Sequence, residues 1–257
     1  MDELTAPLAM PVADALTLLE RGEISVEGRL TSASNATLYC RVELDGVAAA
    51  CVYKPVAGER PLWDYPDGTL AEREVACFQI SAATGWDIVP ATVLRSGPLG
   101  TGMVQLWIAE DESYDLVAAI NHGSQPQLQR VALLDAVLNN SDRKVSHLLP
   151  VTGELPADLH IYGVDHGVSL GVQNRLRTVL WQWAGDPIPD EGLEVLGRLE
   201  AEWESGEADR PSLPGLLTEL LTTAEVRAVR RRIQRLLSRQ RFPTPPQDWP
   251  AIPYPAY

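Results

Sequence analysis

The sequence predicts an α+β fold in two lobes: an N-terminal lobe of antiparallel strands with one helix (1–108) and a mainly helical C-terminal lobe (109–257). Two observations support this prediction. Residues 24–55 form three β-rich runs separated by turn residues, whereas the chain beyond residue 126 repeatedly places apolar residues at helical spacing. With 257 residues, of which 45% are hydrophobic, the chain can bury a substantial core.

Charge and cysteine content exclude several classes of protein. The 35 acidic and 21 basic residues give a formal net charge of -14, which repels nucleic-acid phosphates and anionic lipid headgroups. We therefore expect neither a nucleic-acid partner nor stable membrane association. Cys40, Cys51 and Cys77 are too scattered for a disulfide framework or a zinc site, and we expect reduced thiols. The N-terminus is acidic, unlike a signal peptide, and no apolar run reaches the roughly 18 residues of a membrane span, so we expect a cytoplasmic protein.

The elements of the N-terminal lobe follow from local patterns. Helical spacing of apolar residues predicts a short helix over 11–20. Thr69 and Glu72 have the spacing of a capping box, the run after them is rich in helix formers, and Gly85 supplies a stop, so a second helix is expected between Thr69 and Gly85. Strands are expected as a meander within 24–55, then near 88–95 and 103–108.

The second half begins with a helix in QLQRVALLDAVLNN, which has one apolar face. A hairpin should follow, with strands HLLPV and LHIYGVD joined by a turn-rich segment. Helices are expected near 190–204 and 212–239, the second containing Thr222 and Glu225 in capping-box register. The proline-rich tail cannot be helical, and we expect it to be extended, either docked or frayed.

Lys54 and Glu74 form the first pair of candidate site residues. Lys54 lies at the end of the third strand run, in VYKP, where an inward-pointing lysine can reach the phosphates of a nucleotide under the sheet. Glu74 follows on the predicted helix, where it can pair with Lys54 and fix its direction. Taken singly, a strand lysine and a helical glutamate are usually solvated surface residues. Their order along the chain favours the functional interpretation.

A polar loop after the first C-terminal helix supplies the next candidates. In this loop, DRKVSH, Asp142 is followed five positions later by His147, and kinases of the eukaryotic type use this offset for a catalytic aspartate and a metal-binding asparagine. The alternative is a structural turn in which Asn140 or Asp142 caps backbone groups.

Asp165 is the last candidate, in the tripeptide Asp165-His166-Gly167 after the apolar strand HIYGV. An aspartate that leaves a buried strand is costly to desolvate unless it meets a cation, and a metal ion that bridges phosphates would be such a partner. The alternative is an ordinary strand-to-turn Asp-x-Gly.

The segments VYKP, LAEREVACFQISAATGWDIVP, NNSDRKVSHLL and YGVDHG resemble those of the phosphatidylinositol 3-/4-kinase-like proteins, in particular a group of small bacterial members, and more distantly HipA-type kinases. The resemblance implies a two-lobed protein-kinase-like fold that binds ATP. It implies that Lys54 binds phosphate with Glu74 as its partner and that Asp142 and Lys144 are catalytic, with Lys144 contacting the transferred phosphoryl group. Asp165 would belong to the metal-binding motif.

The sequence departs from that pattern at three places. The first strand-to-strand turn, TSASNAT, has no glycine, so phosphate would be held there by Ser32, Ser34 and Asn35. His147 stands where asparagine is usual, which makes it a candidate ligand for magnesium or manganese beside Asp165. His166 stands where phenylalanine is usual.

Together these features predict an ATP-dependent phosphotransferase that acts on a hydroxyl of a soluble protein or a small molecule. Two alternatives remain open at this point. One is a pseudokinase that binds nucleotide and works as a protein-interaction module, and the other is transfer of AMP from the same site.

Overall fold

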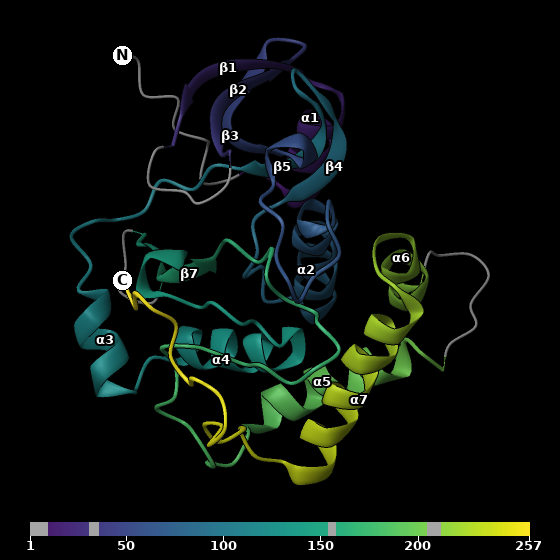
Figure 1. Cartoon of the computed structure of the whole chain (residues 1–257). Coiled ribbons are helices and arrows are strands. Elements are labelled where there is room, and N and C mark those ends of the chain that lie inside the picture. Colours follow the sequence, from purple (N-terminus) through teal and green to yellow (C-terminus); the bar gives the residue numbers. More distant parts are fainter. Residues whose placement is uncertain (1–9, 31–35, 154–157, 205–211) are drawn as a thin grey trace.

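Five antiparallel strands form one sheet at one end of the molecule (Figure 1). The computed structural model describes residues 10–30, 36–153, 158–204 and 212–257. The strands lie in the order β1-β2-β3-β5-β4, so the predicted meander of the first three strands is confirmed. Their bounds are β1 Glu23–Arg29, β2 Leu38–Leu44, β3 Val47–Pro55, β4 Thr92–Gly97 and β5 Gly100–Leu106.

The turn between β2 and β3 shows why the meander could be predicted. Asp45 and Gly46 both have positive φ, 50° and 81°, which is the backbone of a tight two-residue hairpin. Across this hairpin Cys40 faces Cys51, and both are buried. These two thiols and Cys77 are free, as predicted, and they pack in the interior of the sheet region.

Helices α1 (Val12–Arg21) and α2 (Leu70–Thr84) accompany the sheet. Gly85 ends α2 in the left-handed region, with φ of 73°, as predicted. The predicted capping box at the start of α2 is wrong. Thr69 donates its hydroxyl to the carbonyl of Pro66 instead, and the carboxylate of Glu59 accepts hydrogen bonds from the first two amides of the helix.

The other end of the molecule is mainly helical, and Figure 1 shows α2 between it and the sheet. The predicted hairpin is present as an antiparallel pair. The capping box of Thr222 and Glu225 is confirmed, and it begins α7 after a break that divides the expected 212–239 helix in two. The elements are α3 Leu116–His122, α4 Pro126–Leu138, β6 Leu148–Val151, β7 His160–Gly163, α5 Asp190–Ala201, α6 Leu213–Leu220 and α7 Thr223–Arg239, with 3-10 turns η1 Val56–Gly58 and η2 Val145–His147.

A buried ion pair joins α2 to α7. The guanidinium of Arg73, 1% exposed, bonds the carboxylate of Glu225 and also donates to the carbonyl of Ser169 at 3.0 Å. The same guanidinium lies 4.6 Å from the centre of the Tyr65 ring. Because Arg73 precedes Glu74 on α2, this anchor fixes the helix that carries a candidate site residue.

The proline-rich tail is docked. The amides of Val145 and Thr178 donate to the carbonyls of Ala256 and Ala251, at 2.9 and 3.0 Å. The indole nitrogen of Trp181 also donates to the carbonyl of Ala251. The tail therefore lies against both the loop that contains Asp142 and the segment that follows Asp165.

Within the described residues, no helix combines the length and the apolar character needed to cross a membrane.

Candidate active site

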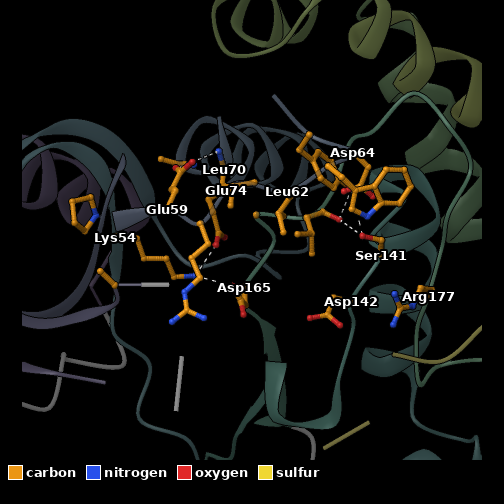
Figure 2. Close-up of a pocket in the computed structure, with 18 of the residues that line it drawn as sticks. Lys54, Glu59, Leu62, Asp64, Leu70, Glu74, Ser141, Asp142, Asp165 and Arg177 are labelled. Atoms are coloured by element: carbon orange, nitrogen blue, oxygen red, sulfur yellow. Dashed lines mark hydrogen bonds and ion pairs between the residues drawn. The ribbon is translucent and has the colours of Figure 1, made fainter. Parts of the chain in front are cut away.

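Lys54 lies at the centre of a three-residue charge cluster. Its Nζ is 2.7 Å from Oε1 of Glu74 and 2.8 Å from Oδ1 of Asp165 (Figure 2). Lys54 comes from the end of β3, Glu74 from the buried face of α2 and Asp165 from the segment after β7. The predicted pairing of Lys54 with Glu74 is thereby confirmed as geometry.

The position of Lys54 follows from strand alternation. Tyr53 and Cys51 on β3 are fully buried, and the next side chain along a strand points to the opposite face. Burial lowers the pKa of Lys54, but the carboxylates of Asp165 and Glu74 outweigh this and hold that pKa above its ordinary value. The Lys54 ammonium keeps the pKa of Asp165 well below its usual range. Lys54 and Asp165 are therefore both charged at neutral pH.

Glu74 also holds the Asp165-His166-Gly167 segment in place. Its second oxygen, Oε2, accepts a hydrogen bond from the amide of His166 at 2.8 Å. Asp165 itself has φ of 60°, in the left-handed region that a non-glycine residue adopts at some energetic cost. Glu74 is 2% exposed. One buried carboxylate thus positions both the lysine and the strained aspartate that face the site.

The side chain of Arg143 is buried in the interior and does not line the cavity. It is 0% exposed and forms a bidentate ion pair with Asp135 of α4, each bond being 2.9 Å. It also donates to the carbonyls of His147 and Val164. Nη2 of Arg143 lies 2.6 Å from Nε2 of His166, and since a guanidinium only donates, that nitrogen accepts. Burial, and after it the positive charge of Arg143, hold the pKa of His166 well below its ordinary value, so this ring is neutral.

The loop that carries Asp142 is shaped by the two asparagines before it. Asn139 ends α4 in the left-handed region, with φ of 54°. Oδ1 of Asn140 accepts the amide of Asp142 at 3.0 Å, so Asn140 performs the turn role that was an alternative for this segment. The carboxylate of Asp142 instead lies 3.0 Å from Nζ of Lys144.

His147 and Asp165 are adjacent, as expected of two ligands of one ion. Nε2 of His147 is 3.4 Å from Oδ2 of Asp165. Burial lowers the pKa of His147 and outweighs the opposing charge of Asp165. The ring is therefore neutral at neutral pH and can offer a nitrogen lone pair to a metal ion. The described residues contain no cluster of three acidic, histidine or cysteine side chains suited to a metal. His147 and Asp165 fit a metal that draws its remaining ligands from phosphate oxygens and water.

A cavity of about 370 Å³ lies next to the charge cluster of Lys54, Glu74 and Asp165. Lys54, Asp165 and Asp142 line it, and so do two tryptophans that come from the loop before α2 and from the C-terminal tail, Trp63 and Trp249. In Figure 2, Asp142 lies between Asp165 and Arg177. The cavity therefore has room beyond the charge cluster, on the far side of Asp142 from Lys54. Ser32, Ser34 and Asn35, predicted to hold phosphate, lie outside the described residues.

Comparison of the sequence with known proteins identifies its family. The sequence is 40% identical to protein Rv2133c of Mycobacterium tuberculosis over 289 aligned residues, which cover 97% of this chain and 98% of that protein. The chain belongs to the family of Rv2133c. No family model matches the sequence.

Among solved structures, the kinase CtkA of Helicobacter pylori covers 86% of this chain and 94% of its own, with a TM-score of 0.51 and 11% identity. This likeness shows that the chain has a protein-kinase-like fold. HipA of Shewanella oneidensis and Rio2 of Chaetomium thermophilum match with TM-scores of 0.43 and 0.37, both at 11% identity.

Sequence patterns alone did not identify several residues of this site. Asp135 lies on the buried face of α4, where a carboxylate without a partner is unfavourable. An acidic residue among the apolar residues of this helix could therefore have indicated a buried partner. Glu59, Arg177 and Trp249 carry no such signal, because their roles depend on contacts with segments distant in the sequence.

Proposed function

We propose that this protein is an ATP-dependent phosphotransferase that modifies a hydroxyl group of a soluble acceptor. The observation that carries the proposal is the position of Lys54, which contacts Glu74 and Asp165 while lining the same cavity as Asp142. This is the arrangement that positions and neutralises the phosphates of ATP beside an acceptor.

In the proposed reaction the acceptor oxygen bonds to the γ-phosphorus as the bond from that phosphorus to its bridging oxygen breaks. ADP leaves with the bond's electron pair, and the hydroxyl proton passes to Asp142. Lys54 binds phosphate oxygens, and Lys144, now paired with Asp142, is placed to contact the transferred group. A magnesium or manganese ion held by Asp165 and His147 would neutralise charge on the phosphates.

The finer classification is also part of the proposal. The order of Lys54, Glu74, Asp142 and Asp165 along the chain supports a phosphatidylinositol 3-/4-kinase-like subtype, with the lobes divided near residues 108 and 109. The net charge of -14 disfavours an anionic membrane or a nucleic acid as the acceptor, so we propose a soluble acceptor.

A nucleotide-binding pseudokinase is the second candidate. His147 replaces the usual asparagine, and the Asp142 carboxylate is engaged by Lys144, an arrangement that permits nucleotide binding without efficient transfer. Transfer of AMP would use the same cluster.

One experiment separates these candidates. The protein is incubated with magnesium or manganese and ATP labelled at either the γ- or the α-phosphate, with a bacterial metabolite extract and with protein substrates. Label transferred only from the γ-position supports the proposal, and label transferred from the α-position indicates AMP transfer. Thermal stabilisation by ATP without any transfer would indicate the pseudokinase. Absence of stabilisation and of transfer with either metal would contradict all three.

A further inference from the structure

Two residues of the cavity wall each carry a buried nitrogen donor without an acceptor. Nε of Arg177 and Nε1 of Trp249 are both inaccessible to solvent, and within the described residues neither has a hydrogen-bond partner. Both residues line the cavity that contains Asp142. A buried donor left unpaired is unfavourable, and two such residues in the wall of one cavity favour a ligand that accepts hydrogen bonds once these side chains turn towards it.

Arg177 differs from other charged groups of the cavity. Lys54 is paired with Glu74 and Asp165, and Glu59 accepts the first amides of α2. No described residue accepts a hydrogen bond from the side chain of Arg177, although its guanidinium carries a full positive charge.

The backbone of Arg177 is fixed to the Asp142 loop on both sides. Its amide donates to the carbonyl of Asn140 at 2.9 Å, and its carbonyl accepts the amide of Arg143 at 3.0 Å. Figure 2 shows its side chain beyond Asp142, on the side away from Lys54. An anion bound by Arg177 would therefore sit beside Asp142 without occupying the position next to Lys54.

Trp249 is held in place by an aromatic stack. The guanidinium of Arg175 lies 4.7 Å from the centre of the Trp249 ring and 4.5 Å from that of Trp63. Arg175 is itself oriented by Asp64 at 2.7 Å. This stack joins the loop before α2 to the C-terminal tail, and it fixes the position of the Trp249 indole.

We infer that Arg177 and Trp249 bind an anionic group, a phosphate or a carboxylate, on a small-molecule acceptor whose hydroxyl then lies at Asp142. The volume of about 370 Å³ is in the range of small-molecule sites. A charged guanidinium and a neutral indole donor in the wall of the same cavity suit an oxyanion. The anion site stands on its own geometry, whereas its assignment to the acceptor rests on the proposed phosphotransferase function.

Titration of the full-length protein with inorganic phosphate and, separately, acetate tests this inference, with calorimetry and tryptophan fluorescence as readouts. We expect saturable binding of at least one anion by the wild type. Arg177→Gln should weaken it about tenfold, because a charge-assisted hydrogen bond is lost. Trp249→Phe, which keeps the aromatic stack, should weaken it several-fold. Arg231→Gln, which removes a matched charge from the exposed face of α7, should leave it unchanged.

Lys54→Met distinguishes this site from the proposed ATP site. Anion binding that survives Lys54→Met and is lost in Arg177→Gln supports the inference, even if ATP does not bind and the proposed function fails. Anion binding that is lost in Lys54→Met and kept in Arg177→Gln would overturn it, as would a wild type that binds neither anion. The melting temperature of each variant without ligand shows whether it is folded, and Trp249→Phe provides the test if Arg177→Gln is not.

Discussion

Asp135 and Arg143 form a bidentate ion pair in which both side chains are fully buried. Because Arg143 also donates to the carbonyls of His147 and Val164, this pair ties α4 to the Asp142 loop and to the strand that leads into Asp165. The pair is thus the internal support of the site.

Removal of one partner of this pair should be costly. Asp135→Asn leaves the buried guanidinium of Arg143 without its counter-charge, and we expect the free energy of unfolding to fall by about 3–5 kcal/mol. Asp142→Asn, which affects a half-buried pair, should change it by less than about 1 kcal/mol. Urea unfolding followed by circular dichroism measures both. Equal stability of the two variants would show that the buried pair does not support the fold.

The start of α2 offers a test of the observed cap. Glu59→Ala removes the acceptor of two helix amides and should destabilise the protein by about 0.5–2 kcal/mol. Thr69→Ala removes a hydroxyl that donates to the carbonyl of Pro66 and accepts a long hydrogen bond from Nε of Arg73, but caps no amide of the helix, and it should cost less. Thermal unfolding of both variants shows which substitution lowers stability more. A larger loss of stability in Thr69→Ala would favour the capping box that the sequence suggests.

The contrast between the two capping boxes shows what local sequence determines. Thr222 and Glu225 form one because Glu225 bonds Thr222 through one carboxylate oxygen while the other pairs with Arg73. At the start of α2, Glu59 from a loop that folds back onto the helix takes the first two amides instead of Thr69. Strands and helices were predictable because their signals are local periodicities. The missed helix α3 is short, and Gly123 ends it in the left-handed region, with φ of 63°.

The candidate site was predictable to a similar extent. Lys54, Glu74 and Asp165 occur in recognisable segments, and the structure brings them together. The partners that fix them were not predictable. The pairing of Asp135 with Arg143 and the return of Trp249 to the cavity depend on tertiary contacts that no short segment encodes.

Lys54 and Glu74 should act as a coupled pair in nucleotide binding. Lys54→Met should reduce the thermal stabilisation by ATP, because a phosphate contact is lost while the bulk of the stem remains. Glu74→Gln should have a smaller effect, since it misdirects the lysine. Each shift is measured against the ligand-free melting temperature of the same variant. In the double variant the losses should be less than additive, by about 0.5–3 kcal/mol. Full additivity would contradict a direct functional pairing.

His147 should determine the choice of metal and its pH dependence. A nitrogen ligand favours manganese over magnesium, so ATP binding should be stronger with manganese, and His147→Asn should restore preference for magnesium. Because burial lowers the pKa of His147, the neutral ring persists below 6.5, the ordinary histidine value, and binding should decline only at more acidic pH.

Calorimetric titration of ATP with each metal across pH, in the wild type and His147→Asn, measures both effects. The charged groups that act on the ring, namely Asp165, Arg143, Asp142 and Lys144, are unchanged by the substitution. Loss of binding already above pH 6.5, or an unchanged metal preference in the variant, would remove His147 from the metal site.

In the proposed function, Asp165 and its cluster bind ATP through a metal ion. The most direct test is the calorimetric affinity for ATP, with magnesium and with manganese, of the wild type, Asp165→Ala and Asp142→Asn. We expect Asp165→Ala to abolish metal-dependent binding with either ion, since it removes the anionic ligand that both require. Asp142→Asn should bind ATP like the wild type and fail only to transfer phosphate. Metal-dependent binding of ATP by Asp165→Ala with wild-type affinity would contradict the account.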